Sequence, residues 1–439
     1  MAGWPLTKPI KVFFTERKNL ILPFCYLFVS LILRNAFLKI KEHILTLVLA
    51  SGMWPPALFP QVSPRQISFD FYGDTVEFVL SPDFNVRFEE ALSPQSVERF
   101  YNTLSEASYS PVIKALTACR EKNKMDDWLF YQLIRKTAQQ ISPKKDNYHR
   151  YTLYKWFLLM KSGYDATLSY SGNQLLFYVH SDEIIYNIPY RIREGRQYVC
   201  LNYHDYGSID FEKNQFTEII VPEPMAKKAF TYKITQLPQF KPADYSEKQV
   251  VFNYYQHEYH FTLKLNPQIQ ALFANYPVVD YSYYFNIPLS RETYSSLIPS
   301  LKKNMKGMST KTGVDYLMRF TRYAFLYEKD EVFFGKEKRL SPEETLLYDR
   351  SDCEDRVALF FYLVKEIYNL PMIVLVYPQH VTIAVEFDKP VGNTIVHNGR
   401  KYSICEPTPQ KSDLQVGQML PELRNESYYI AYEYTPKRN

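Results

Sequence analysis

The chain has 439 residues and 46% hydrophobic content, which is enough material for about two to four domains with substantial cores. Its 38 Tyr and 30 Phe beside only 13 Gly favour a globular, sheet-rich protein. The net charge of +5 is spread along the chain without a long basic block, so a nucleic-acid partner is not expected. The five cysteines are too few and too scattered for a disulfide scaffold or a zinc site, and no cofactor or metal is predicted.

Two apolar runs, residues 20–33 and 44–60, dominate the first 62 residues, and basic residues precede each of them. The first run is short for a bilayer span, whereas the second, which includes Ala50-Ser51-Gly52, is typical of a signal peptide displaced inward. We therefore expect residues 1–62 to be a signal- or anchor-like segment of an exported, periplasmic or membrane-anchored protein. The alternative is a buried N-terminal hairpin in a soluble protein.

Residues 63–209 are predicted to form an α+β domain. The alternating pattern ISFDFYGDTVEFVL predicts a strand pair, and helices are expected at 94–106, 110–121 and 126–142. An apolar helix at 151–162 ends at Gly163. Three strand-like segments follow it, with the sequences ATLSYS, LLFYVH and GRQYVCLN.

The stretch 210–290 contains short β-like segments that prolines separate, such as KAFTYKITQLP and VVDYSYYFNIP. This pattern predicts a β-sandwich-like domain with exposed edges. Residues 291–439 return to helical patterns and form the last expected domain. In this part Ser341, Pro342 and Glu344 have the spacing of a capping box, and YYIAYEY near the end predicts a closing strand.

Cys353 stands at the start of an apolar helix predicted to end before Pro371. Ser351 or Asp352 is the expected N-cap, which places the cysteine in the first turn. Unpaired backbone N–H groups and the helix dipole favour negative charge there, and such a setting lowers the pKa of a thiol. A nucleophilic cysteine is therefore predicted at this position.

Two further residues could complete a nucleophilic triad with Cys353. His380 leads the alternating strand VTIAVEF after a Tyr-Pro-Gln turn, and Glu406 ends a later strand just before Pro-Thr. A nearby imidazole would accept the thiol proton, and a carboxylate on its far nitrogen would fix its tautomer.

The segments SDCEDR, QHVTIAVEF and ICEPT together resemble the transglutaminase-like branch of the papain-fold cysteine enzymes. In that family a Cys opens a helix, a His begins a strand, and an Asp precedes Pro-Thr on the next strand. The resemblance covers about residues 315–408, and Glu406 departs from the usual Asp.

The resemblance implies an α+β fold with a papain/transglutaminase-like catalytic domain at residues 291–439. It also implies a cysteine-dependent acyl-transfer enzyme that acts on a peptide or protein amide through Cys353, His380 and Glu406. Hydrolysis is favoured because the family's bacterial members look mostly like peptidases. A lysine amine as the acceptor would give cross-linking instead.

Other interpretations of these residues stay open. Cys353 has acidic neighbours that repel a thiolate, so a non-catalytic envelope protein that uses this fold to bind a partner is the main alternative. A membrane-associated assembly factor is a third. The acidic run 349–355 lacks the glycine turn and distal Glu of an EF-hand loop, so we expect a solvated helix N-terminus rather than a Ca²⁺ site.

The order of elements before residue 209 repeats after residue 291. Helix 151–162 matches 357–368, and GRQYVCLN matches GRKYSICE, at offsets of 206 and 204 residues. At these offsets Asn147, Gln174 and Asn202 stand near the places of Cys353, His380 and Glu406. We therefore hypothesise a duplicated unit whose first copy has lost its chemistry, against the alternative of two unrelated segments that share an element order.

Overall fold

The computed structural model describes residues 11–12, 63–207 and 209–436. It is a mixed α+β structure, and its described part contains eleven α-helices and two curled antiparallel half-barrel sheets. The predicted α+β class is confirmed at this level. The expected signal or anchor lies outside the described residues, except that β1 (Lys11–Val12) pairs with a strand of the first sheet. No helix in the described ranges is long and apolar enough to cross a membrane.

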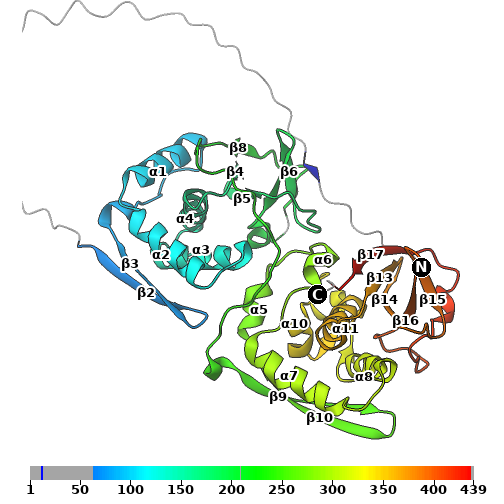
Figure 1. Ribbon diagram of the computed structural model, residues 1–439. Helices are drawn as coiled ribbons and strands as arrows, with labels where there is room; N and C mark the ends of the chain where they lie inside the picture. Colours follow the sequence, from blue (N-terminus) through cyan, green and yellow to red (C-terminus); the bar gives the residue numbers. More distant parts are fainter. Residues whose placement is uncertain (1–10, 13–62, 208, 437–439) are drawn as a thin grey trace, which may run out of the picture.

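The N-terminal unit consists of a hairpin, four helices and the first curled sheet (Figure 1). The hairpin is β2 (Arg65–Phe71) and β3 (Asp74–Leu80), and the helices are α1 (Pro94–Glu106), α2 (Ser110–Lys122), α3 (Asp127–Ile141) and α4 (Tyr148–Lys161). Across the sheet the strands are β6 (Tyr190–Arg193), β7 (Arg196–Cys200), β5 (Gln174–His180), β4 (Ala166–Ser171) and β8 (Thr217–Ile219). All these segments agree with the predicted pattern to within a few residues, apart from β6, for which no specific prediction was made, and β8, which was expected in the following domain.

The C-terminal unit also begins with a hairpin, formed by β9 (Ser246–Tyr254) and β10 (His257–Leu265). Its helices are α5 (Gln268–Phe273), α6 (Tyr281–Tyr284), α7 (Arg291–Asn304), α8 (Thr310–Tyr323), α9 (Asp330–Phe333), α10 (Pro342–Leu347) and α11 (Cys353–Tyr368). The short strands β11 (Leu326–Tyr327) and β12 (Arg350–Ser351) pair in parallel. The sheet is β15 (Thr394–His397), β16 (Arg400–Cys405), β14 (His380–Glu386), β13 (Met372–Tyr377) and β17 (Tyr429–Tyr434).

The two sheets have the same strand order. In each unit a helix leads into a strand pair, a second pair follows, and a final strand returns to the edge beside the first strand of the sheet. The pairing registers also agree, because Tyr178 faces Cys200 as Ala384 faces Ile404, and His180 faces Tyr198 as Glu386 faces Tyr402. Asn202 therefore occupies the position of Glu406.

The predicted β-sandwich at 210–290 is wrong. Three of its predicted strands, TEIIVPEP, KQVVFNYY and EYHFTLKL, do correspond to β8, β9 and β10, but β8 joins the N-terminal sheet and β9 and β10 form a separate hairpin. The segments KAFTYKITQLP and VVDYSYYFNIP are not strands. The stretch 230–241 is irregular, and 281–284 is the short helix α6. Closely spaced prolines remove ladder donors, so aromatic alternation alone does not make strands here.

The aromatic residues mainly fill the cores. Around Phe84 and Phe157, for example, rings meet edge to face or tilted at centroid distances of 5.4 to 6.5 Å. Such contacts stabilise a core beyond the burial of apolar area. This agrees with strand and core filling as the reason for the high Tyr and Phe content.

Candidate active site

Cys353 is the first residue of α11, and Asp352 is its N-cap. The Asp352 side chain accepts hydrogen bonds from the backbone N–H groups of Glu354 and Asp355, and the Asp355 carboxylate accepts one from the N–H of Asp352. This reciprocal capping box fixes where the helix begins, so the position predicted for Cys353 is confirmed. Cys353 as a whole residue is half-buried.

His380 and Glu406 meet directly. His380 is the first residue of β14, Glu406 follows the last residue of β16, and Nε2 of the imidazole lies 2.7 Å from Oε2 of the carboxylate. Burial disfavours the imidazolium, but the charge and hydrogen bond of Glu406 outweigh it and raise the pKa of His380. With Nε2 held by Glu406, Nδ1 is the nitrogen left to exchange a proton.

The thiol of Cys353 lies beside the first peptide unit of β14. Its sulfur is approached by the backbone N–H of Val381, the residue after His380, and its hydrogen is donated to Oε2 of Glu354 at 2.8 Å. The helix α11 therefore brings the cysteine beside the strand that carries the histidine, but no hydrogen bond joins the Cys353 sulfur to the His380 imidazole among the described residues.

The charge balance at the thiol differs from the expectation. Burial raises the pKa of Cys353 well above its usual range, and the Glu354 and Asp352 carboxylates raise it further. The Val381 N–H acts in the opposite direction without reversing the result. The expected lowering of the pKa is therefore wrong for this geometry, because the carboxylates and burial outweigh the helix N-terminus.

The acidic residues around the cysteine are buried rather than solvated. Asp355 is completely buried, Asp330 is 2% exposed and Asp352 is 8% exposed. Burial raises the pKa of Asp355 to about 7, and burial together with the charge of Asp355 raises the pKa of Asp330 to about 9. The predicted solvated helix N-terminus is therefore wrong.

Two overlapping groups of side chains could share a cation. One is Asp352, Cys353 and Glu354, and the other is Asp330, Asp352 and Asp355; within each, one ligand atom per residue lies within 4.8 Å of the others. The carboxylate oxygens of the second group are donors of the kind that Ca²⁺ and Mg²⁺ prefer. Its carboxylates carry raised pKa values, so protonation is an equally direct way to remove their mutual repulsion.

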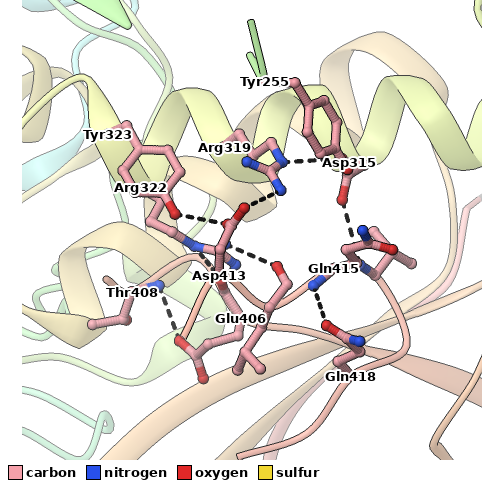
Figure 2. A network of polar contacts seen from close by, with 12 residues as sticks. Tyr255, Asp315, Arg319, Arg322, Tyr323, Glu406, Thr408, Asp413, Gln415 and Gln418 are labelled. Carbon is pink, nitrogen blue, oxygen red and sulfur yellow. Dashed lines mark hydrogen bonds and ion pairs between the residues drawn. The ribbon is translucent and has the colours of Figure 1, made fainter. Parts of the chain in front are cut away.

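Glu406 is held by a buried arginine network (Figure 2). Arg322 on α8 is 1% exposed and donates to the backbone oxygen of Glu406 at 3.1 Å and to that of Leu414 at 2.8 Å. Its other partner is Asp413 at 3.0 Å, which also accepts from Arg319 at 2.6 Å. The Oε1 atom of Glu406 accepts the N–H of Thr408 at 2.9 Å, so both ends of the residue are positioned.

Sequence reasoning named Glu354 only as one of the acidic neighbours that repel a Cys353 thiolate, and it did not single out Arg322 or Asp413. Arg322 interrupts an otherwise apolar face of α8, and an arginine in that place was the one available signal of a buried polar contact. Asp413 lies in an irregular loop about 90 residues away, and no local pattern links the two. Glu354 belongs to the acidic run, but its contact with the thiol depends on side-chain orientation.

The corresponding place in the N-terminal unit contains a different set of contacts. Asn147 is the N-cap of α4, so Tyr148 stands in the position of Cys353, one residue later than the sequence offset indicated. The Asn202 side chain donates to the Tyr148 hydroxyl at 2.8 Å and accepts from the N–H of Phe177 at 2.7 Å. Gln174 begins β5 as His380 begins β14. Asn202 also accepts a hydrogen bond from the Cys200 thiol at 3.6 Å, but the positions of Cys353 and His380 are occupied by a tyrosine and a glutamine.

No protein-family model, no curated protein and no solved structure matches the chain. Its function must therefore be argued from the arrangement of its own residues.

Proposed function

We propose that the chain is a cysteine-dependent acyl-transfer enzyme of the transglutaminase-like type that hydrolyses a peptide or amide bond. The observation that carries this proposal is the His380–Glu406 pair at 2.7 Å on the strand whose next amide approaches the Cys353 sulfur. A nucleophile, a base and a residue that orients the base are thus contributed by three separate elements. Glu406 in place of Asp still reaches the imidazole, because the longer side chain ends at Nε2.

The reaction would proceed through a thioester. Nδ1 of His380 takes the proton of the Cys353 thiol as the sulfur attacks the amide carbonyl, and the C–O π electrons move to oxygen. When the C–N bond breaks, the His380 proton passes to the departing amine. A water molecule then loses a proton to His380 and attacks the thioester, which releases the acid and restores the thiol.

Glu354 keeps this site in its protonated form at rest. The thiol hydrogen is directed to Glu354, and the raised pKa of Cys353 means that the sulfur keeps its proton at neutral pH. Proton transfer to His380 would then occur with the attack rather than before it. Such general-base assistance contributes about a hundredfold or more to the rate in enzymes that use it.

A peptide or protein substrate agrees with the surface beside the thiol. Leu326 and Tyr327 on β11, and Val332 and Phe333 on α9, are between 41% and 70% exposed. Tyr327 lies close enough to Cys353 for a charge on the sulfur to raise the pKa of the Tyr327 hydroxyl. The strand β11 pairs with β12 directly before the helix that carries Cys353. Exposed apolar side chains next to a reactive group favour a substrate with apolar residues near the cleaved bond.

The repeated strand order supports a duplicated transglutaminase-like unit whose first copy no longer has the chemistry. Tyr148 and Asn202 take the places of the thiol and the carboxylate, and they hydrogen-bond each other. In this proposal the N-terminal unit has become structural or ligand-binding, and residues 1–62 would attach or export the protein.

One observation favours a second candidate, a non-catalytic binding or scaffold protein of the same fold. The thiol is paired with a carboxylate and its pKa is raised, which is the reverse of the usual reactive cysteine. The N-terminal unit further indicates that the scaffold persists without a triad.

Alkylation of Cys353 by iodoacetamide at pH 8 distinguishes the two functions. If His380 acts as the base, wild-type protein should react at least about tenfold faster than His380→Ala, a conservative fraction of the usual general-base effect. Cys353→Ser identifies the labelled residue. Equal rates in wild type and His380→Ala would contradict the enzyme and leave the binding scaffold.

A further inference from the structure

The two half-barrels differ on their concave faces, which are turned away from the helices. In the C-terminal unit this face is apolar and is filled by the loop after Glu406. Its buried members form a cluster of their own, made of Ile373, Leu375, Tyr377, Ala384, Tyr402, Ile404, Leu414, Leu420 and Leu423. This half-barrel therefore has an ordinary hydrophobic interior.

The same positions in the N-terminal unit are polar. By strand register, Thr167 stands for Ile373, Ser169 for Leu375, Tyr178 for Ala384 and Arg191 for Ile395. Thr167, Ser169, Tyr178 and Arg191 are all at most 3% exposed. An interior that is apolar in one copy has thus become hydroxyl-rich and cationic in the other, although the backbone topology is the same.

Arg191 lacks the hydrogen bonds that a buried guanidinium needs. Its Nε, Nη1 and Nη2 atoms are all buried, and none makes a hydrogen bond among the described residues. Nη2 lies 2.8 Å from Oε1 of Glu218, close enough for an ion pair but not aligned as a hydrogen bond, and the guanidinium lies over the Tyr178 ring at 4.5 Å. Leaving such donors unsatisfied costs free energy, which a ligand oxygen would recover.

A second arginine lies near the same carboxylate. Arg193 is 3.9 Å from Glu218 and 3.6 Å from Glu194, whose side chain is 78% exposed. Glu218 is therefore shared by two guanidinium groups, and it does not satisfy the donors of Arg191.

A cavity opens at the end of this interior. Its volume is about 150 Å³, and its lining includes Thr167 and Arg193. At about 30 Å³ for each water in the liquid, this is room for a ligand of a few heavy atoms. Asp165 and Glu223 also line it, but Arg196 and Lys161 respectively pair with them.

We propose that the concave face of the N-terminal half-barrel binds a small carboxylate ligand, with Arg191 and Arg193 as the cationic groups. The ligand carboxylate would accept hydrogen bonds from the donors that Glu218 leaves free. The ligand chain would occupy the adjoining cavity. This site is separate from Cys353 and does not depend on the proposed enzymatic function.

Propionate is a suitable probe, with the full-length protein at constant ionic strength adjusted by chloride. Saturation-transfer NMR on the propionate methyl group should show saturable binding to wild type. Arg193→Gln and Arg191→Met should weaken it at least about tenfold, as expected when a charged hydrogen bond is removed. Glu218→Gln should strengthen it, because the internal competitor loses its charge.

Arg87→Gln is the matched control, since it removes one positive charge from the same unit at a side chain that is 85% exposed and does not line the cavity. If it weakens propionate as much as Arg193→Gln does, the effect is general charge and the proposal fails. Absence of saturable binding to both wild type and Glu218→Gln also overturns it. Should Arg191→Met fail to fold by circular dichroism, the opposite changes expected for Arg193→Gln and Glu218→Gln still decide.

Discussion

Glu354 controls the protonation of the proposed nucleophile. It accepts the Cys353 hydrogen at 2.8 Å, and its charge is the largest cause of the raised thiol pKa after burial. A neutral amide in its place keeps the shape and removes the repulsion. We therefore expect this side chain, together with burial, to keep the thiol protonated.

The variant Glu354→Gln should lower the pKa of Cys353 by about one unit or more, as expected when a neighbouring like charge is removed. Below that pKa the alkylation rate should rise about tenfold for each unit of the shift. The rate of iodoacetamide reaction against pH measures it. Glu366→Gln, near the other end of the same helix, is the control and should leave the profile unchanged. A Glu354→Gln profile identical to wild type would remove Glu354 from the account.

Glu406 determines the charge state of His380. Because its carboxylate raises the pKa of the imidazole, Glu406→Gln should lower that pKa by about one unit or more. Glu406→Asp, the residue usual in the resembling family, should retain part of the effect. Titration of the imidazole by NMR measures both.

Glu433→Gln tests the specificity of that titration, because it breaks the similar His397–Glu433 pair elsewhere in the same sheet. This variant should leave the pKa of His380 unchanged. A His380 pKa that is insensitive to Glu406→Gln would contradict a functional pair.

At the scale of elements, the loop after Glu406 is fixed where Gly417 lies close to the backbone of Val391 and Gly392. A Cβ on Gly417 would lie 2.4 Å from the Val391 carbonyl oxygen, and Gly417 has a φ of 86°. Its N–H donates to the Ile404 oxygen at 2.8 Å, so the loop is tied to the strand that delivers Glu406. Backbone atoms cannot move aside as a flexible side chain can.

Gly417→Ala should therefore reduce the free energy of unfolding by at least about 2 kcal/mol through overpacking and left-handed strain. Gly399→Ala is the matched control, because Gly399 also has a positive φ but open space around its Cβ position. It should cost about 1 kcal/mol, the left-handed strain alone. Urea unfolding measures both, and equal losses would show that the close approach has no energetic effect.

The buried start of α11 makes stability depend on pH. Folding raises the pKa of Asp330 to about 9 and that of Asp355 to about 7. A raised pKa means that the folded protein holds these protons more tightly, so their stabilising contribution is lost as the pH rises from about 4 through these values.

The asparagine of Asp330→Asn cannot lose a proton, so this variant should reduce the fall in the free energy of unfolding as the pH rises. Relative to wild type, the variant should gain more than about 1.4 kcal/mol between pH 5 and pH 9, the equivalent of one pKa unit. Unfolding by urea at several pH values measures the gain. The exposed Asp146→Asn should show none, and a wild-type stability that does not fall towards pH 9 would contradict the buried acidic cluster.

At the scale of the whole molecule, two similarly built units diverge in opposite places. The C-terminal unit has a thiol, imidazole and carboxylate at one end of its sheet and an apolar concave face. The N-terminal unit has a tyrosine–asparagine contact at that end and a buried arginine on its concave face. Similar frameworks can therefore specialise at separate sites.

Local patterns allowed much of this organisation to be predicted. Short-range residue spacing determines the Ser341–Glu344 capping box, the strand that His380 begins and the offset of the repeated strands. The stretch 210–290 was mispredicted because aromatic alternation resembles a strand even where prolines prevent pairing. The pKa of Cys353 and the Arg322–Glu406 contact depend on burial and long-range packing, which no local pattern contains.

The most direct test of the account is acylation of Cys353 by an activated ester such as p-nitrophenyl acetate. Wild type should form an acetyl thioester at Cys353, detected by mass spectrometry, and release it with turnover. Glu354→Gln should acylate faster, whereas Cys353→Ser should not acylate, and His380→Ala should acylate slowly and fail to release the group. An absence of acetyl–Cys353 in both wild type and Glu354→Gln, with the fold intact, would contradict the proposed acyl-transfer function.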